Sequence, residues 1–218
     1  MQIQLLTTQD ISAKLVSNLV KSVPKLFPSE IQFLDPTYYH LGKEAFDNPN
    51  YYFIDFLGEF VPVTERIISG YANPNLDTLI LMSRPYNENC FNIVGYGYAG
   101  RQIPAGSCDF IQGKAMVKIA LTSGFKKNLL VTCHELYHAL LGPTEGGFYT
   151  SKDEVIIPPG HCNNHIAGKR CIMNVPAETV EESPKDYLLK IENITLEMHL
   201  GFCDSCKGKL MDSIVKRE

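Results

Sequence analysis

The segment 134–138 reads His-Glu-Leu-Tyr-His, and its residue types and spacing suit metal chemistry. Two histidines at positions i and i+4 of a helix can each aim a ring nitrogen at one zinc ion, and the intervening glutamate can reach a water beside the metal. Zinc lowers the pKa of such a water from about 15.7 toward 7, so a carboxylate can take its proton and leave a hydroxide that attacks a carbonyl carbon. The motif predicts zinc ligands at His134 and His138 and a general base at Glu135.

A third ligand is needed, because catalytic zinc is usually held by three protein groups with water in the fourth position. His161 is the first candidate, since it directly precedes Cys162 in a cysteine-rich region. His165 competes with it. An acidic ligand, Glu145 or Glu154, would instead define a gluzincin-type hydrolase. The residues alone leave this choice open.

The sequence contains seven cysteines, and disulfide pairing alone would leave at least one of them unpaired. Four of them follow the histidine motif and could form a closed zinc–thiolate site; they are Cys162, Cys171, Cys203 and Cys206. The other three lack ligand spacing and are expected to pack as small apolar side chains; they are Cys90, Cys108 and Cys133. The sequence thus predicts two zinc ions per chain, one catalytic and one structural.

The histidine motif needs a helix to position it. Residues 127–141 have the apolar spacing of a helix, and Gly142 and Pro143 follow as a stop signal. At about 100° per residue, the two histidines and Glu135 share one arc of roughly 100°. The opposite face is apolar and carries Leu129, Cys133, Leu136 and Leu140. One face of this helix should enter the core while the other carries the chemistry.

The other expected elements alternate between strands and helices. Strands are expected at 2–5, 31–34, 76–82, 92–98 and 115–122, and helices at 15–23, in the second half of 35–58 and from Ser183 toward Cys203. This order predicts a single layered α/β (α+β) domain over residues 1–218, with a twisted mixed sheet. Its N-terminal part would end near 142, and a C-terminal lobe would span about 161–218. Strand 115–122 is the expected sheet edge for an extended peptide.

Composition excludes several classes of protein. With 218 residues, 44% of them hydrophobic and 20% charged, the chain has the character of an ordinary globular protein large enough for a core. A net charge of −4 offers no basic field for nucleic acid. Because the sequence lacks a signal-peptide pattern and an apolar run near 18 residues, no membrane association is expected. The expected location is the cytoplasm, where clustered cysteines favour metal over disulfides.

Taken in order, the motifs H-E-x-x-H, His-Cys, Cys-x-Met and Cys-x-x-Cys resemble the archaemetzincins, a branch of the metzincin zinc peptidases. The resemblance covers about residues 127–210. It implies a metzincin-like zincin domain with an active-site helix, a zinc-stapled C-terminal lobe and peptide hydrolysis of an aminopeptidase-like kind. It also implies roles for individual residues: catalytic zinc at His134, His138 and His161, Glu135 as base, structural zinc at Cys162, Cys171, Cys203 and Cys206, and Met173 beneath the catalytic metal.

The chain departs from the family pattern after the second histidine. The family places a glycine three residues later and the third histidine three residues beyond it, whereas here Gly142 comes one position late and His161 far downstream. Residues 142–160 are interpreted as an insertion beside the metal, which costs little because each doubling of loop length adds only about 0.6 kcal/mol of closure entropy. The expected function is a zinc-dependent peptidase acting on peptide or protein substrates. The alternatives are the gluzincin-type hydrolase and a non-enzymatic, zinc-structured binding protein.

Overall fold

The protein is represented by a computed structural model, which describes residues 1–8, 11–39, 71–82, 105–111, 114–121, 124–142, 148–150, 155–157, 160–174 and 198–216. The elements in chain order are β1 (Gln2–Thr8), α1 (Ala13–Ser22), η1 (Pro24–Leu26), β2 (Gln32–Phe33), β3 (Thr37–Tyr39), β4 (Asp77–Met82), β5 (Ala105–Ile111), β6 (Lys114–Ala120), α5 (Phe125–Leu141), β7 (Phe148–Thr150), β8 (Val155–Ile157), β9 (His165–Ile166), β10 (Lys169–Arg170) and α7 (Asp204–Val215). Strands and helices alternate through the chain, and the predicted mixed α/β class is confirmed.

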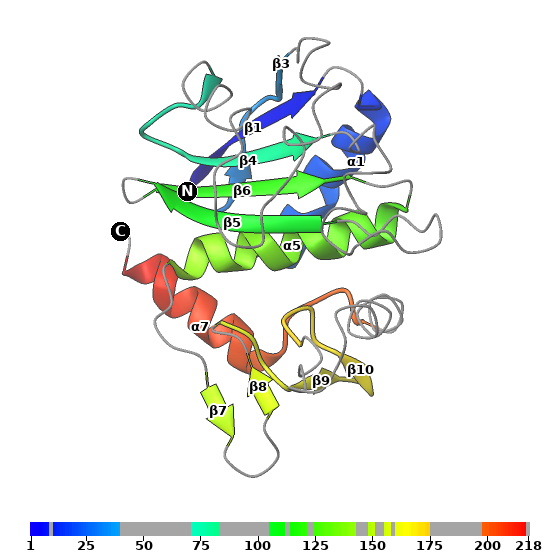
Figure 1. Ribbon diagram of the computed structural model, residues 1–218, viewed down its shortest axis with the longest axis vertical. Helices are drawn as coiled ribbons and strands as arrows, with labels where there is room; N and C mark the ends of the chain where they lie inside the picture. Colours follow the sequence, from blue (N-terminus) through cyan, green and yellow to red (C-terminus); the bar gives the residue numbers. More distant parts are fainter. Residues whose placement is uncertain are drawn as a thin grey trace.

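The main sheet has the order β2-β1-β4-β6-β5, and β3 also pairs with β1. Its strands are parallel except for β5, which runs antiparallel to β6. Figure 1 shows this sheet lying above α5. The expectation that strand 115–122 forms the edge is wrong, because β6 lies between β4 and β5. The strand β5 pairs with β6 at the end of this order, so it is the terminal strand of the sheet in the part of the chain that the structure describes.

The two strands β1 and β4 form the centre of the core. Leu5 and Leu6 of β1, and Ile80 and Leu81 of β4, are buried at consecutive positions. Consecutive buried residues are typical of parallel strands covered on both faces, since successive side chains point to opposite sides. This burial explains why the first strand extends to Thr8 rather than ending near Leu5.

The helix α5 begins at Phe125, two residues before the expected start, and ends at Leu141. Gly142 follows with φ 83°, a left-handed conformation that glycine adopts without a Cβ penalty, so the predicted stop is confirmed. The expected apolar face is buried, as shown by Leu129, Cys133, Leu136 and Leu140. This face packs on β5, β6 and α1, which fixes the rotation of the helix about its axis.

The C-terminal helix α7 packs against the C-terminal end of α5 (Figure 1). The Ser213 hydroxyl of α7 donates to the Leu140 carbonyl oxygen at 2.6 Å. The Phe202 ring stacks on Tyr137 with centroids 5.1 Å apart and meets Phe27 edge-on at 5.0 Å. These contacts join the segment before α7 to the hydrophobic core, which continues as far as Ile214.

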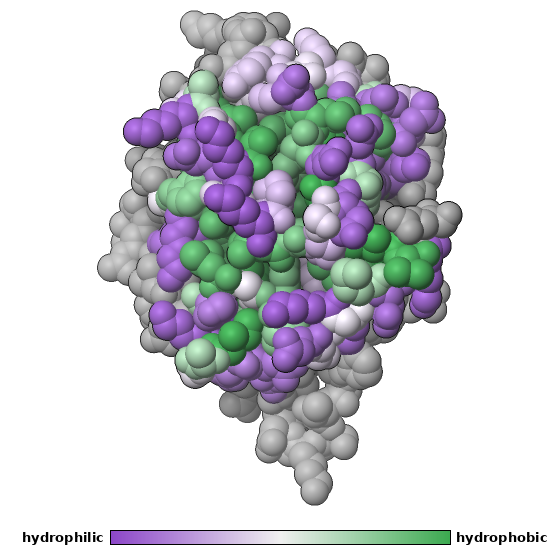
Figure 2. All heavy atoms as spheres, turned by 180° about the vertical axis from the view of Figure 1, so that it is seen from behind, coloured by the Kyte–Doolittle hydropathy of each residue, from purple (hydrophilic) through white to green (hydrophobic). Residues whose placement is uncertain are grey.

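The exposed large apolar side chains are distributed over several elements. Figure 2 shows apolar and hydrophilic residues interspersed over the back of the molecule. The exposed large apolar side chains of the described residues are Tyr38, Tyr71, Phe125, Leu200, Met211 and Val215. Among the described helices, none combines the length and apolar character needed to cross a bilayer.

The sequence did not predict several of the described elements, namely η1, β3, β5, β7, β8, β9, β10 and α7. The strand expected at 92–98 and the helix expected in the second half of 35–58 lie outside the described residues. Most of the helix expected from Ser183 toward Cys203 also lies outside them, and the described residues 198–203 are not helical. The other expected elements are confirmed within a few residues at each end.

Candidate metal centres

Three histidine side chains converge beside the C-terminal half of α5. The Nε2 atoms of His134 and His138 lie 3.3 Å apart, and His161 Nε2 lies 2.9 Å from the first and 3.3 Å from the second. The helix supplies two of the rings from adjacent turns, as the i, i+4 spacing predicts. The third ring comes from a segment distant in sequence. All three residues are half-buried.

These distances fit a tetrahedral zinc ion. Zinc–nitrogen bonds of about 2.0–2.1 Å at tetrahedral angles separate the nitrogens by about 3.3–3.4 Å. Three ring nitrogens at such distances cannot satisfy one another by hydrogen bonding alone, because each neutral ring has one donor and one acceptor nitrogen. A cation at their centre would meet all three lone pairs. Among the described residues the donor set numbers three, which suits a catalytic rather than a structural zinc site.

The orientation of His134 is fixed by a backbone carbonyl. His134 Nδ1 lies 3.1 Å from the Ile172 carbonyl oxygen. A carbonyl oxygen only accepts, so Nδ1 must carry the proton and Nε2 presents its lone pair to the metal position. Burial, with smaller contributions from the His161 and His138 rings, holds the pKa of His134 well below its ordinary 6.5. Burial and His161 also lower the pKa of His138, to about 4, so both rings are neutral near pH 7.

Gly160 allows the chain that carries His161 to pass close to the His138 ring. Its φ is 77°, and a Cβ added there would lie 2.9 Å from His138 Nδ1 and 3.0 Å from the ring Cε1. No real Cβ tolerates such contacts, so a larger residue would displace the His138 ring or the chain that carries His161. The sequence signal for this turn was the Pro-Pro-Gly run directly before His161.

The structure separates the remaining candidates. Glu135 is half-buried on α5, next to His134. His165 is exposed on β9 and does not join the histidine cluster. The acidic candidates Glu145 and Glu154 lie outside the described residues.

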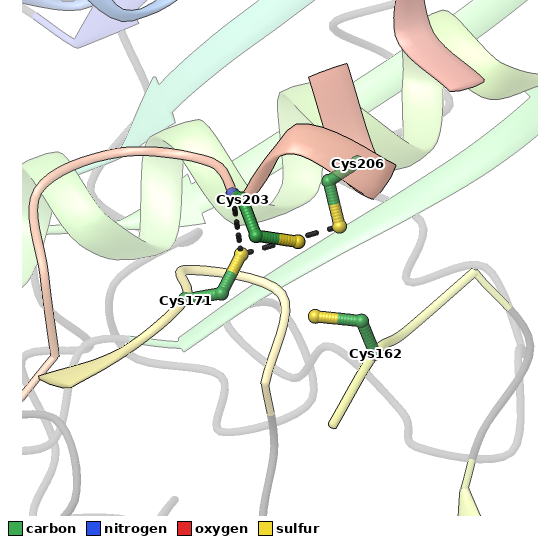
Figure 3. A group of neighbouring side chains, drawn as sticks. All are labelled: Cys162, Cys171, Cys203 and Cys206. Carbon is green, nitrogen blue, oxygen red and sulfur yellow. Dashed lines mark hydrogen bonds between the residues drawn. The ribbon is translucent and has the colours of Figure 1, made fainter. Parts of the chain in front are cut away.

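Four cysteines form a second cluster, close in sequence to the first. Their Sγ atoms lie within 4.8 Å of one another, and Figure 3 shows the thiols pointing toward a common centre. The Sγ atoms of Cys171 and Cys206 are 4.0 Å apart. Zinc–sulfur bonds of about 2.3 Å place tetrahedral sulfurs about 3.8 Å apart, so a contraction of at most about 1 Å would close the cluster on zinc. The members are those predicted: Cys162, Cys171, Cys203 and Cys206.

The surroundings of this cluster favour a thiolate at Cys171, whereas hydrogen bonds with the neighbouring thiols raise the pKa of Cys206 and raise that of Cys162 to about 12. The pKa of Cys171 lies below its ordinary value because the Cys162 and Cys206 thiols, followed by backbone groups including the Cys203 N–H, hydrogen-bond to its sulfur. The Cys203 N–H lies 3.3 Å from Cys171 Sγ. Cys203 is also the N-cap of α7, so the positive end of the helix dipole faces the sulfurs. Among the described residues no cysteine pair forms a disulfide.

Of the three cysteines outside this cluster, Cys133 is fully buried, as expected of a packing residue. Cys108 is half-buried against the core. Cys90 lies outside the described residues. Met173 is fully buried, and its carbonyl oxygen accepts a hydrogen bond from the Cys162 N–H at 2.9 Å.

Several residues that support the two clusters have no clear signal in the sequence. The Ile172 contribution is a backbone carbonyl, which any residue could supply. Tyr137, between the two helix histidines, donates its hydroxyl to the Cys206 carbonyl oxygen at 3.2 Å. Asn164 and Asn174 are polar residues near cysteine positions, and neither the burial of Asn174 nor the contacts of the two side chains could be read from the sequence.

Neither a protein-family model nor a curated protein matches the sequence. Among solved structures, the chain is similar to archaemetzincin from Methanopyrus kandleri, with 15% identity and a TM-score of 0.49 over 99% of this chain and 96% of that one. It is also similar to archaemetzincin from Archaeoglobus fulgidus complexed with malonate, with 16% identity and a TM-score of 0.42 over 96% and 99% of the two chains. Both are archaemetzincins, the family that the sequence motifs resemble. At these values, any functional conclusion has to stand on the geometry of the two clusters.

Proposed function

We propose that this protein is a zinc-dependent peptidase whose catalytic zinc is bound by His134, His138 and His161. The observation that carries the proposal is the convergence of three Nε2 atoms at separations suited to tetrahedral zinc. The Ile172 carbonyl supports it, because a metal-binding histidine usually donates its other ring N–H to such a group.

Zinc bound there would lower the pKa of a water molecule and polarise a peptide carbonyl. Glu135 is the general base: its carboxylate accepts the proton of the attacking water and then passes it to the leaving amine. The neutral states of His134 and His138 near pH 7 keep both rings available as ligands. The half-buried setting of Glu135 leaves its carboxylate accessible to a substrate.

The substrate in this proposal is a peptide or a protein segment in extended conformation. Such a segment would add along β5, the terminal strand of the described sheet, by main-chain hydrogen bonds. This assignment moves the peptide edge from β6 to β5. Aminopeptidase-like cleavage of short peptides remains what the family resemblance suggests.

The second zinc of this proposal is structural and is held by the four-cysteine cluster. Three of its four thiols are buried, which suits a closed site without a position for substrate. The compartment in this proposal is the reducing cytoplasm, where clustered cysteines favour metal over disulfides. Neither a membrane nor a nucleic acid is a partner in this proposal.

The test is cleavage of a diverse peptide library by the zinc-loaded protein and by Glu135→Gln. Loss of a general base should lower kcat by about 100-fold to 10,000-fold, while the zinc content stays at two per chain. The matched control is Glu30→Gln, the same change at an exposed residue, which should leave both quantities unchanged. If wild type cleaves no peptide, or if Glu135→Gln cleaves as fast as wild type, the proposed mechanism is wrong and the non-enzymatic alternative gains support.

A further inference from the structure

Residues 161–174 form a hairpin that contributes to both metal centres, and we call it the shared hairpin. Its strands β9 and β10 pair antiparallel around Ala167 and Gly168, which have φ of 49° and 75°. Two central residues with positive φ are typical of a tight two-residue β-turn. The two legs of the hairpin are therefore held in a defined register.

Each leg carries one residue of each centre. The first leg carries His161, whose ring joins the histidine cluster, followed directly by Cys162 of the cysteine cluster. The second leg carries Cys171, followed directly by Ile172, whose carbonyl orients His134. A shift of either leg would change both clusters, because adjacent Cα atoms are only about 3.8 Å apart.

Asn174 fastens the two legs together. It is fully buried, and its Nδ2 donates to the Asn164 carbonyl oxygen at 2.9 Å. Its Oδ1 accepts from Arg170 Nη1 at 3.0 Å. The same Asn164 carbonyl accepts the Cys171 N–H at 3.1 Å. A buried amide with both its donor and acceptor engaged fixes geometry more strictly than apolar packing does.

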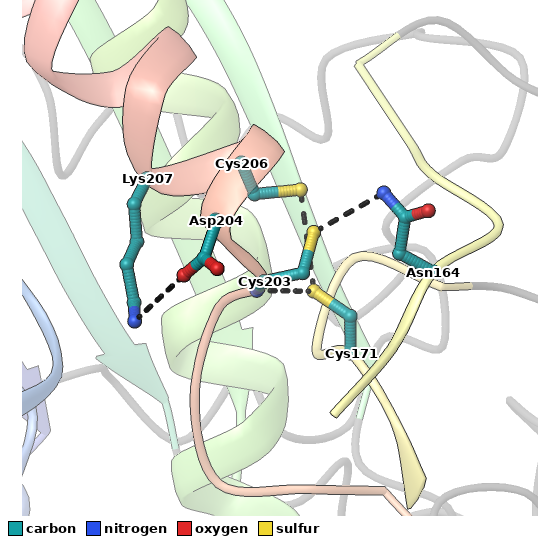
Figure 4. Close-up of polar contacts among 6 residues, drawn as sticks. All are labelled: Asn164, Cys171, Cys203, Asp204, Cys206 and Lys207. Atoms are coloured by element: carbon teal, nitrogen blue, oxygen red, sulfur yellow. Dashed lines mark hydrogen bonds and ion pairs between the residues drawn. The ribbon is translucent and has the colours of Figure 1, made fainter. Parts of the chain in front are cut away.

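The hairpin is also joined to α7. Asn164 Nδ2 donates to Cys203 Sγ at 3.3 Å, as Figure 4 shows. Cys206, one turn further along α7, receives the Tyr137 hydroxyl on its carbonyl oxygen. Tyr137 lies between the two metal-facing histidines of α5. The residues of the cysteine cluster thus connect the shared hairpin with the first turn of α7. Through the Tyr137 hydroxyl they are also joined to α5, the helix of the histidine cluster.

We propose that the two centres are energetically coupled through the shared hairpin, with Asn174 as the positioning residue. A metal held by the four thiols fixes both legs against α7, so that His161 and the Ile172 carbonyl are already in place when the histidine cluster binds its own metal. Filling the cysteine site therefore raises the affinity of the histidine site for zinc. This inference rests on the two metal sites of the proposed function, and extends it to how the catalytic site is assembled.

The test measures zinc affinity at the histidine site by chelator competition, in four forms of the full chain. Wild type and Asn174→Ala are each compared with the cysteine site filled and with that site removed by Cys203→Ser and Cys206→Ser together. With Asn174 present, the histidine site should bind zinc at least about 10-fold more tightly when the cysteine site is filled than when it is removed, the range found for groups that orient metal ligands. In Asn174→Ala, the ratio of these two affinities should be close to one. A ratio of one in wild type, or an unchanged ratio in Asn174→Ala, overturns the proposal.

A second measurement avoids the double cysteine variant in case it fails to fold. In chains that retain one zinc in the cysteine site, Asn174→Ala should weaken zinc binding at the histidine cluster about 10-fold, with an unchanged circular dichroism spectrum. Asn174→Asp should behave in the same way, because it keeps an acceptor for Arg170 but loses the donor to Asn164. The control is Asn163→Ala, an exposed neighbour, which should change nothing.

Each outcome of this second measurement decides the question. If Asn174→Ala leaves the histidine-site affinity unchanged, or releases both metals together, Asn174 does not couple the sites and the proposal is wrong. Because the readout is metal affinity, it is independent of peptide cleavage. A chain that couples its sites but cleaves no peptide would refute the proposed function alone, and a peptidase with independent sites would refute only the coupling.

Discussion

The two clusters are neighbours in the sequence but differ in accessibility. All three histidines are half-buried, whereas three of the four cysteines are buried and Cys162 is half-buried. Two of the three nitrogen separations are 3.3 Å, as in tetrahedral zinc sites, and the third is 2.9 Å, while the sulfurs span up to 4.8 Å. A site with three protein ligands suits reaction with a substrate, and a closed four-thiolate site suits fold stabilisation.

The difference shows how one chain can separate stability from chemistry. Histidines on a rigid, well-packed helix can be held in position while remaining partly accessible. The four cysteines come from two segments, residues 161–174 and the start of α7, and a metal bound by all four would join these segments.

Removal of one structural thiol should destabilise the protein most. Cys206→Ser should reduce zinc from two to one per chain and lower the free energy of unfolding by more than about 4 kcal/mol, because loss of a structural metal is among the largest effects of a single substitution. Thermal denaturation and metal analysis check this. The control is Cys133→Ala, a buried cysteine outside the cluster, which should keep both zinc ions. Two zinc ions in Cys206→Ser would contradict the structural assignment.

Removal of the third histidine should abolish activity with little change in stability. His161→Ala should weaken zinc binding at the histidine site by more than about 100-fold, since loss of an outer group alone costs 10-fold to 100-fold. Calorimetric zinc titration measures this, and His165→Ala is the matched control. If His161→Ala keeps catalytic zinc while Glu145→Ala or Glu154→Ala loses it, the third ligand is acidic and the gluzincin-type alternative holds.

A methyl group at Gly160 should affect the histidine site alone. Gly160→Ala and Gly168→Ala both place a Cβ at positive φ, at a cost of about 1–2 kcal/mol each. Only at Gly160 does that Cβ meet the His138 ring, whereas at Gly168 nothing lies within 4 Å. Zinc affinity at the histidine site should fall about 10-fold in the first variant only. Equal affinities in the two variants would show that the close approach is unimportant.

The smallest effect is expected at the ion pair beside the cysteine cluster. Lys207 Nζ lies 3.5 Å from Asp204 Oδ1, and both side chains are largely exposed to solvent (Figure 4). Exposed pairs contribute little because water and salt screen them. Lys207→Ala should therefore retain two zinc ions and shift the thermal midpoint by less than about 1 °C. Loss of zinc in this variant would mean that the lysine charge stabilises the thiolates.

The elements with strong local patterns could be predicted from the sequence. α5 was predicted because its apolar period and Gly-Pro stop are local signals. β5 was missed because Ala-Gly-Ser-Cys-Asp-Phe-Ile has no clear alternation, and pairing with β6 makes it a strand. α7 contains Gly208, which weakens helix propensity, and its contacts with α5 compensate.

The residue types that could bind metal, including the four cysteines, are evident from the sequence. The helix face that carries His134 and His138 is evident too, because helical geometry links positions four residues apart. The fold was needed to show that His161 rather than His165 meets the helix, that the Ile172 carbonyl orients His134, and that Asn174 is buried between two legs of a hairpin. These contacts join segments distant in sequence, often through backbone atoms that every residue shares, so their positions depend on how the whole chain packs.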